Sequence, residues 1–252
     1  CIRDSFGTVD GCSAAVEAGV IDPGIIAEMS GTSTVLLMPT EGQVFNDQFI
    51  AIEHAIPNRN LRLGAMVSSG ASIAWLEQNI FKGHTSISDL MAKSEKVPAG
   101  SAGLIFLPYM MGERSPIWNS NARGVFYGLS LATTAEMIFR ATLEGTAFAM
   151  RHNVLAAKDS GIRAEVVRSL GGGTRNNLWN QIKADVLGIP VVTIAESSGA
   201  ALGCAYLAGF GLGVFKDIRE PLNANLKIEG TFEPNPKVQD LYLEQFQVYR
   251  NI

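Results

Sequence analysis

Two patterns of apolar residues alternate along the chain. In the first, short apolar or β-branched runs are bounded by Gly, Pro, Asn or Asp, a pattern typical of strands. Such runs occupy residues 26–30, 33–38, 48–55, 103–108, 165–170 and 190–194. In the second, apolar residues recur at three- and four-residue steps, which predicts helices. These segments are residues 12–18, 69–79, 134–160, 176–187, 199–208 and 238–249.

The order of these elements predicts the fold class. Strands follow one another closely in the early part of the chain, whereas helices dominate later, with strand–helix units near Gly103 and Glu165. We therefore expect an α/β fold in which a mixed sheet is flanked by helices. Residues 220–237, rich in Pro, Asn and Glu, are expected to form a surface loop. The sequence contains no internal repeat and no low-complexity linker.

Composition and charge narrow the class of protein. Hydrophobic residues make up 47% of the 252 residues and charged residues 17%, as in globular proteins. The net charge is −4 and no run of five Lys or Arg occurs, so we expect no nucleic-acid partner. Apolar stretches end well before the roughly 18 residues that a membrane span needs, so we expect no membrane partner. Cys1, Cys12 and Cys204 form no CxxC pair, which disfavours a disulfide framework or a zinc site and fits a reducing cytoplasm.

Asp10 is the first candidate for chemistry. Small residues surround it in the segment Gly-Thr-Val-Asp-Gly-Cys-Ser-Ala-Ala, residues 7–15, and a helix is expected to start beside it. An aspartate in this position is most often an N-cap. The alternative is a general base on a tight turn, where only small neighbours let a substrate approach. The local sequence leaves both interpretations open.

Two glycine-containing segments are candidates for binding a phosphorylated ligand. Residues 30–34, Ser-Gly-Thr-Ser-Thr, join two expected strands, and the backbone N–H groups and hydroxyls of such a turn can face phosphate oxygens. Residues 170–179, Leu-Gly-Gly-Gly-Thr-Arg-Asn-Asn-Leu-Trp, follow a strand and open a helix, whose N-terminus favours negative charge. This second segment matches neither GxGxxG nor the P-loop. Ordinary structural turns are the alternative for both segments.

Two charged segments complete the set. Residues 112–116, Gly-Glu-Arg-Ser-Pro, follow an expected strand, and the adjacent Glu113 and Arg114 are expected to form a solvated pair that contributes little to stability. Glu196 precedes a helix of small residues, for which Ser197 or Ser198 would be the cap. Neither segment points to a reaction by itself.

In their order and spacing, these segments resemble the second domain of the FGGY carbohydrate kinases, a family that includes xylulokinases, gluconokinases and glycerol kinases. The resemblance covers residues 10–217 and rests on eight separated motifs. They are Asp10, GTS at 31–33, SGASIAWL at 69–76, PYMMGERSP at 108–116, ARGVFYGLS at 122–130, LEG at 143–145, GGGTRNNLWNQIKAD at 171–185 and ESSGAA at 196–201. It implies one domain over residues 1–252, of the actin/Hsp70/hexokinase type, with an RNase H-like mixed sheet flanked by helices.

The resemblance also assigns roles to single residues. It implies that Asp10 takes the proton from a sugar hydroxyl and that Gly31 and Thr32 form the second phosphate loop. Further nucleotide contacts are implied for Gly70, Gly172, Gly173, Thr174 and Asn177. Ala74 stands where glycerol kinases often have Gln. The implied cofactors are ATP and Mg²⁺, and the implied reaction is the phosphorylation of a sugar hydroxyl.

A further expectation concerns the other half of the family's active site. Family members begin with a sugar-binding domain that carries an Asp-x-Gly-Thr phosphate loop, which residues 10–12 do not match. Because the chain begins with Cys1 rather than Met, we expect it to be the C-terminal nucleotide-binding half of a longer polypeptide. Isolated, this half is expected to bind ATP or ADP weakly and to turn over little or nothing. Since family members are often dimers, a homodimer is an expected assembly.

The acceptor sugar and two rival functions remain open. Residues 112–130 look closest to xylulokinase-like and gluconokinase-like members, so a pentulose such as xylulose is expected, with gluconate as the alternative. One rival is a non-catalytic actin-like module that binds ATP and would have no need of Asp10. The other is a nucleotide-free structural or sugar-binding domain, in which all the glycines are turn residues.

Overall fold

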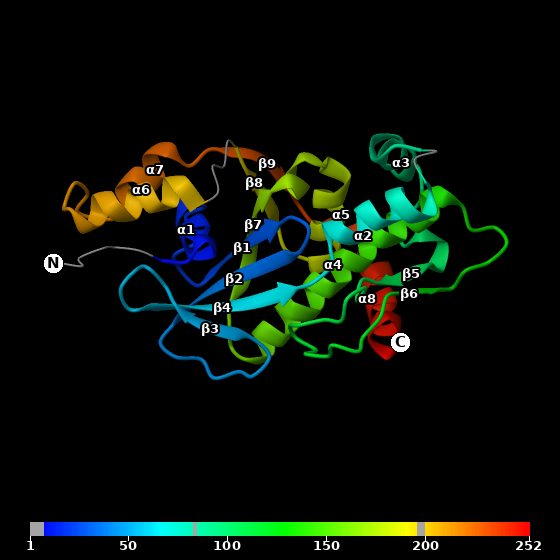
Figure 1. Ribbon diagram of the computed structural model, residues 1–252, viewed down its shortest axis with the longest axis horizontal. Coiled ribbons are helices and arrows are strands. Elements are labelled where there is room, and N and C mark those ends of the chain that lie inside the picture. Colours follow the sequence, from blue (N-terminus) through cyan, green and yellow to red (C-terminus); the bar gives the residue numbers. More distant parts are fainter. Residues whose placement is uncertain (1–7, 83–84, 196–199) are drawn as a thin grey trace.

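The computed structural model describes residues 8–82, 85–195 and 200–252 (Figure 1). Within these ranges a seven-stranded sheet forms the centre, in the order β3-β4-β2-β1-β7-β8-β9. Its strands are β1 (Gly24–Ser30), β2 (Thr34–Glu41), β3 (Ile50–Glu53), β4 (Arg59–Met66), β7 (Ala164–Gly171), β8 (Val191–Ile194) and β9 (Ile228–Phe232). The short strands β5 (Ile105–Leu107) and β6 (Val125–Tyr127) pair with each other outside it.

The sheet is mixed, as the sequence predicts. Strands β3, β4, β2 and β1 are antiparallel neighbours, whereas β7 runs parallel to β1 and β8 runs parallel to β7. Strand β9 closes the far edge antiparallel to β8. The early hairpins and the later strand–helix units therefore join at the β1–β7 pair, where the register places Ser30 opposite Gly171.

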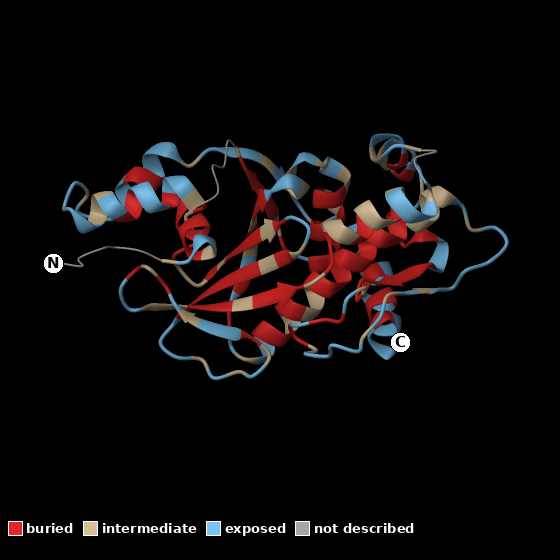
Figure 2. Ribbon diagram, in the orientation of Figure 1, coloured by how far each residue is buried: buried red, intermediate tan, exposed pale blue. Residues whose placement is uncertain are grey.

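Helices cover both faces of the sheet (Figures 1 and 2). One side holds α1 (Asp10–Glu17), α6 (Ala200–Gly211) and α7 (Arg219–Asn225); the other holds α4 (Ala135–Asp159), α5 (Asn177–Leu187) and α8 (Pro236–Asn251). Successive strand residues point to opposite faces, so Ile26 and Leu36 pack with α4 whereas Ala27 and Leu37 pack with α1. Because both faces are buried, these strands appear in the sequence as nearly continuous apolar runs.

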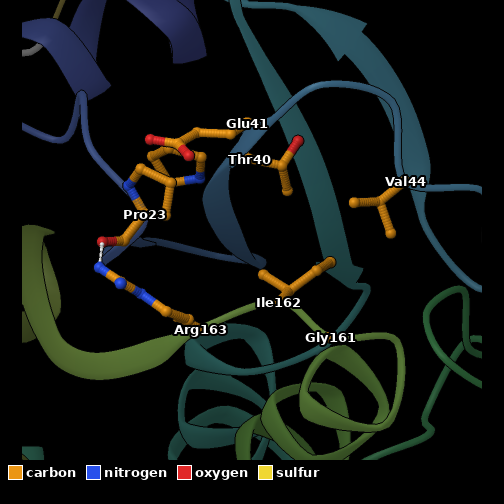
Figure 3. A pocket seen from close by; sticks show the side chains of 8 residues that line it. Pro23, Thr40, Glu41, Val44, Gly161, Ile162 and Arg163 are labelled. Carbon is orange, nitrogen blue, oxygen red and sulfur yellow. Dashed lines mark hydrogen bonds between the residues drawn. The ribbon is translucent and has the colours of Figure 1, made fainter.

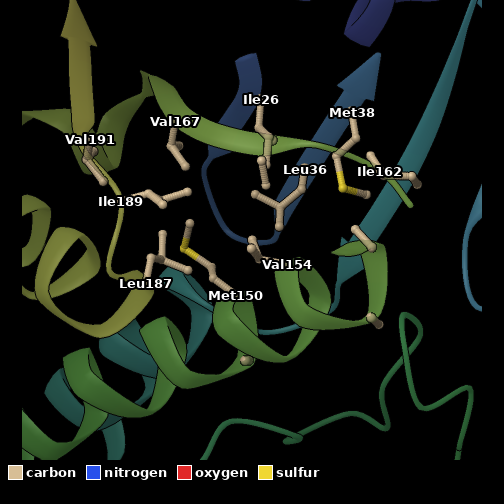
Figure 4. Close-up of a cluster of buried hydrophobic side chains, with 14 of the residues drawn as sticks. Ile26, Leu36, Met38, Met150, Val154, Ile162, Val167, Leu187, Ile189 and Val191 are labelled. Carbon is tan, nitrogen blue, oxygen red and sulfur yellow. The ribbon is translucent and has the colours of Figure 1, made fainter. Parts of the chain in front are cut away.

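The largest helix, α4, joins two hydrophobic cores. Met150 and Val154 face the sheet and meet Ile26, Leu36 and Val167 (Figure 4). The opposite side of α4 carries Phe148, which packs against the rings of Tyr242 and Phe246 on α8. Thr134 caps α4 by accepting a hydrogen bond from Met137 N. A helix that is buried on two sides fixes the sheet relative to the outer layer of helices.

Several elements differ from the sequence expectation. Strands β4, β6 and β9 and helices α3 (Ile87–Ser94) and α7 were not expected, and α6 extends to Gly211. The prediction of a surface loop over residues 220–237 was wrong, because this segment contains most of α7 and all of β9. Strand β9 is half-exposed at an edge and therefore lacks the apolar run of a buried strand. Strand β3 spans only Ile50–Glu53 of the expected 48–55.

The expected helix over 69–79 is formed by α2 (Gly70–Trp75) and a π-helical turn (Leu76–Ile80). Among the helices of the described residues, none has both the length and the apolar character to cross a membrane.

Candidate functional site

The carboxyl ends of β1 and β7 lie side by side at one edge of the sheet, and a glycine-containing turn follows each strand. The turn 31–33 leads from β1 into β2, and the 3₁₀ turn Gly172–Arg175 leads from β7 towards α5. A cavity of about 470 Å³ opens between these two turns and the helices α2 and α3. Ligands of open α/β sheets bind outside the carboxyl ends of the parallel strands. The volume lies within the range of roughly 300–1,000 Å³ that is typical of small-molecule sites.

The cavity has a backbone-rich side and an apolar side. The backbone-rich side is formed by Gly31, Thr32, Gly70, Ala71, Gly172 and Gly173. The apolar side is formed by Ile73, Ala74, Ile87, Met91 and Trp179. Arg175 and Asn176 complete the lining. A ligand with a flat apolar part and an anionic part matches this division, since backbone N–H groups bind anions and apolar side chains pack on a ring.

Two of the lining glycines are required by the packing of the protein itself. A Cβ atom added to Gly70 would lie 2.3 Å from the carbonyl oxygen of Gly31, and one added to Gly173 would lie 2.2 Å from Ser30 Oγ. By contrast, a Cβ on Gly172 would meet no atom within 4 Å in the described structure. Close packing within the protein therefore explains why positions 70 and 173 are glycines, whereas Gly172 faces open space.

The structure brings five of the seven proposed nucleotide residues to this cavity: Gly31, Thr32, Gly70, Gly172 and Gly173. Thr174 and Asn177 are not part of its lining. The Thr174 hydroxyl donates to the carbonyl of Gly171, 2.8 Å away, and Asn177 is an exposed first residue of α5. The preceding Asn176 lines the cavity and caps α5 by accepting a hydrogen bond from Trp179 N. Glu196, Ser197 and Ser198 lie outside the described residues.

Asp10 lies at the same edge of the sheet but on its other face. It is the first residue of α1, is exposed and accepts a 2.7 Å hydrogen bond from Gly11 N. The N-cap is Val9, so the interpretation of Asp10 as the cap does not hold. A Cβ on Gly11 would lie 3.7 Å from the sulfur of Met29, which places the first turn of α1 over the end of β1. Asp10 is not among the residues that line the cavity.

The apolar side of the cavity is the part that the sequence analysis missed. Ile87 and Met91 come from α3, an unexpected helix whose N-cap, Ser86, accepts a hydrogen bond from Asp89 N. The spacing of Ile87, Leu90 and Met91, directly after Ser86, is the signal that identifies this amphipathic helix. Ala74 also lines the cavity.

A buried charged cluster lies beneath the cavity. Lys183 of α5 and Glu28 of β1 form an ion pair with a shortest distance of 2.6 Å, and Ser169 of β7 donates a hydrogen bond to the same carboxylate. Lys183 Nζ also lies 4.5 Å from the centre of the ring of Trp179, which lines the cavity. A cation over an aromatic face is attracted to it. The cluster thus joins β1, β7 and α5 directly under the apolar side.

Glu113 does not form the solvated pair that was expected with Arg114. Only 4% of Glu113 is exposed, and its Oε1 accepts hydrogen bonds from the backbone N–H groups of Val67 and Arg114, each at 2.8 Å. Burial raises the pKa of this carboxyl group to about 7, despite those two hydrogen bonds. The expectation was wrong because the 112–116 segment folds against the end of β4, which brings this side chain into the interior.

A smaller cavity of about 190 Å³ lies at the opposite edge of the sheet, where β1 and β7 begin (Figure 3). Pro23, Thr40 and Ile162 line it, and Arg163 donates a 2.8 Å hydrogen bond to the carbonyl of Pro23. It is below the size range of typical ligand sites. Within the described ranges, no three His, Cys, Asp or Glu side chains are grouped as metal ligands.

Comparison with known proteins places this geometry in a family. Residues 27–212 match the model of the C-terminal domain of the FGGY family of carbohydrate kinases. A xylulose kinase of Staphylococcus epidermidis is 30% identical over 248 residues, which cover 98% of this chain and 50% of that protein. The solved structures of a xylulose kinase and a gluconate kinase from Lactobacillus acidophilus each superpose with a TM-score of 0.90 at 27% identity, over 97% of this chain and 50% of theirs.

The mixed sheet with helices on both faces is a domain of the actin/hexokinase type, with an RNase H-like core. The chain belongs to the FGGY family of carbohydrate kinases, and its match is to the C-terminal domain of that family. It spans about half the length of the curated relatives that it matches.

Proposed function

We propose that the chain is the nucleotide-binding half of an ATP-dependent sugar kinase. The observation that carries the proposal is the cavity at the carboxyl ends of β1 and β7, in which glycine-rich backbone faces an apolar side. Membership of a carbohydrate kinase family supports the reaction class. The chain covers half of its relatives, which supports an N-terminal domain as the partner that completes the active site. We propose that this domain belongs to the same polypeptide.

The lining residues fit a nucleoside diphosphate or triphosphate. Trp179, Ile73 and Met91 offer an apolar surface for the base. In the turn 31–33 the N–H group of Gly31 donates to the carbonyl of Ser33, so the N–H groups of Thr32 and Ser33 are the ones that the turn offers to phosphate oxygens. Arg175 adds a positive charge to the lining. Mg²⁺ is usually held largely by substrate phosphates, so the phosphates bound at the turn 31–33 would carry it into the site. When bound, Mg²⁺ would neutralise charge that develops on the transferred phosphoryl group.

We propose that Asp10 is the general base. Its carboxylate is exposed at the N-terminus of α1, where a sugar hydroxyl can reach it, and it would take the hydroxyl proton as the oxygen attacks phosphorus. The turn 31–33 would orient the phosphates in line with that oxygen. Closure of the other domain over Asp10 would exclude water, so that the phosphoryl group passes to the sugar oxygen, with ADP as the leaving group, rather than to water.

The acceptor that we propose is a pentulose such as xylulose, because a xylulose kinase matches over 98% of this chain, whereas glycerol kinases of 32–36% identity match over 71–84% of it. Gluconate is the second candidate, because a gluconate kinase and a xylulose kinase superpose on this chain with the same TM-score of 0.90. Assaying the full-length polypeptide with ATP and each acceptor separates the two.

Replacing Asp10 by Asn in the full-length polypeptide tests the proposed base. We expect the turnover number to fall by about 10²–10⁴-fold, the usual contribution of a positioned general base, while the affinity for ADP is unchanged. Asp240→Asn, which alters an exposed aspartate of α8, is the matched control and should retain turnover.

The outcomes separate the rival functions. Turnover of Asp10→Asn within ten-fold of the unaltered enzyme would reject Asp10 as the base. ADP binding without phosphorylation of any sugar would favour the non-catalytic actin-like module. A folded protein that binds no nucleotide at millimolar concentration would favour the nucleotide-free domain.

A further inference from the structure

Hydrogen bonds from residues 69–71 fix the turn 31–33 through its carbonyl groups. The backbone N–H groups of Ser69 and Ala71 donate to the carbonyl of Thr32 at 3.2 and 2.9 Å, and Gly70 N donates to the carbonyl of Gly31 at 3.2 Å. The hydroxyl groups of Ser69 and Thr34 add a buried hydrogen bond of 2.7 Å. Because these contacts occupy the inner carbonyls of the turn, its orientation depends on where residues 69–71 lie.

Residues 69–71 are in turn fixed through the end of β4. Val67 N donates to Glu113 Oε1 at 2.8 Å, and Ser115 N donates to the carbonyl of Ala65 at 3.1 Å. The carbonyl of Ser115 accepts a 3.1 Å hydrogen bond from Asn153 of α4. The 112–116 segment is thus anchored to the longest helix and holds the backbone that leads into residues 69–71.

We propose that Glu113 is a positioning residue, whose carboxylate fixes Val67 and thereby sets the turn 31–33 for phosphate binding. The proposal rests on the proposed function, since it takes the cavity to be the nucleotide site. The Glu113 carboxylate accepts hydrogen bonds from Val67 and Arg114, neither of which lines the cavity, so it acts through the backbone rather than on the ligand.

The carboxyl group in this place combines an energetic cost with two hydrogen bonds to the backbone. The side chain is 4% exposed, and in the described structure its Oε2 has no hydrogen-bond partner. Burying an ionisable group with one unpaired oxygen destabilises a protein, and an apolar side chain of the same size would avoid this penalty. What the apolar side chain cannot do is accept the N–H groups of Val67 and Arg114.

Calorimetric titration of the chain with Mg·ADP tests the proposal on four proteins: the unaltered chain, Glu113→Met, Glu113→Gln and His54→Met. Glu113→Met keeps the volume and removes both acceptor oxygens. Glu113→Gln keeps an acceptor for Val67 N and puts an amide where Oε2 has no partner among the described residues. His54 is a matched control, because its buried ring holds the turn at the other end of β4, through Ile56 N and the carbonyl of Val20.

We expect Glu113→Met to raise the Kd for ADP at least five-fold, and Glu113→Gln and His54→Met to stay within two-fold of the unaltered chain. A Kd for Glu113→Met within two-fold of the unaltered value would overturn the proposal. So would a Glu113→Gln variant as weak as Glu113→Met, or a His54→Met variant that loses as much affinity. If the unaltered chain binds no ADP, the proposed function itself fails, which is a different result.

Should Glu113→Met not fold, Glu113→Asp carries the same comparison. It keeps a carboxylate, but its side chain is one methylene shorter, so the oxygens lie farther from Val67 N. We therefore expect the same loss of affinity for ADP. An unchanged Kd for a folded Glu113→Asp would overturn the proposal.

Discussion

Replacing Lys183 by Met would leave the Glu28 carboxylate without its cation between the sheet and α5. Both side chains are 0% exposed, and Lys183 Nζ lies 2.6 and 2.9 Å from the two carboxylate oxygens. Ser169 donates to the same carboxylate. Methionine is flexible and unbranched like the lysine stem, so the perturbation is the loss of a charge rather than the creation of a cavity.

We expect Lys183→Met to lower the free energy of unfolding by about 3–5 kcal/mol, the usual effect of removing one partner of a buried ion pair. Combining Glu28→Met with Lys183→Met removes both charges and leaves Ser169 without this acceptor, so we expect a loss below about 2 kcal/mol.

Urea unfolding followed by circular dichroism at pH 7 measures these differences, since a domain has about 5–15 kcal/mol of stability and the single variant should remain folded. Glu165→Gln is the control, because its partner Arg163 lies 3.4 Å away in an exposed pair, with 64% and 67% of the two side chains accessible. We expect the control to lose less than about 0.5 kcal/mol. A loss of less than about 1 kcal/mol of unfolding free energy for Lys183→Met would refute a stabilising ion pair. So would a double variant that loses as much as Lys183→Met and Glu28→Met lose separately when added together.

Two further predictions concern the cavity and Glu113. Gly70→Ala should weaken ADP binding about ten-fold or more, because its Cβ would lie 2.3 Å from Gly31 O and the turn must move. Gly11→Ala lies inside α1, and its Cβ would meet atoms no closer than 3.7 Å, so it should raise the free energy of unfolding by about 0.5–1 kcal/mol. Calorimetry and urea unfolding check the pair, and equal ADP affinity for both variants would contradict the steric argument. Because folding raises the pKa of Glu113 from 4.5 to about 7, the folded protein holds this proton more tightly than the unfolded chain, and this group's contribution to the free energy of unfolding falls as pH rises between those values. Glu113→Gln lacks this titration, so its stability relative to the unaltered chain should rise by about 2–3 kcal/mol from pH 4.5 to 8; a constant difference across that range would count against the raised pKa.

The central strands of the sheet were predicted by the sequence because they are buried on both faces. Strands β1, β2 and β7 appear as apolar runs because helices cover both sides of them. Strand β4 was missed because its sequence, Arg-Asn-Leu-Arg-Leu-Gly-Ala-Met, contains charges and a glycine. Arg62 is nevertheless buried there and donates to the carbonyl of Val44, and Gly64 leaves room for Asn153 of α4. These are tertiary contacts, which local propensity does not record.

The candidate site divides in the same way. Glycine turns after strands are visible in the sequence, so the backbone-rich side of the cavity was anticipated. The apolar side was not, because Trp179 looks like an ordinary core residue of an amphipathic helix and Met91 lies on α3, a helix that was not expected. Glu113 was misread for a related reason: adjacent opposite charges are usually solvated, and only the packing of residues 112–116 against β4 shows that this carboxyl group is buried.

The central claim is that the nucleotide binds between the turn 31–33 and the turn Gly172–Arg175. Amide hydrogen exchange of the chain with and without saturating Mg·ADP tests it most directly, because bound ligand slows exchange where it contacts or stabilises the backbone. We predict slower exchange in peptides that cover residues 30–34, 69–74 and 172–179, and no change at residues 161–163, which border the smaller cavity. Unchanged exchange in the first three segments, or protection confined to residues 161–163, would contradict the account.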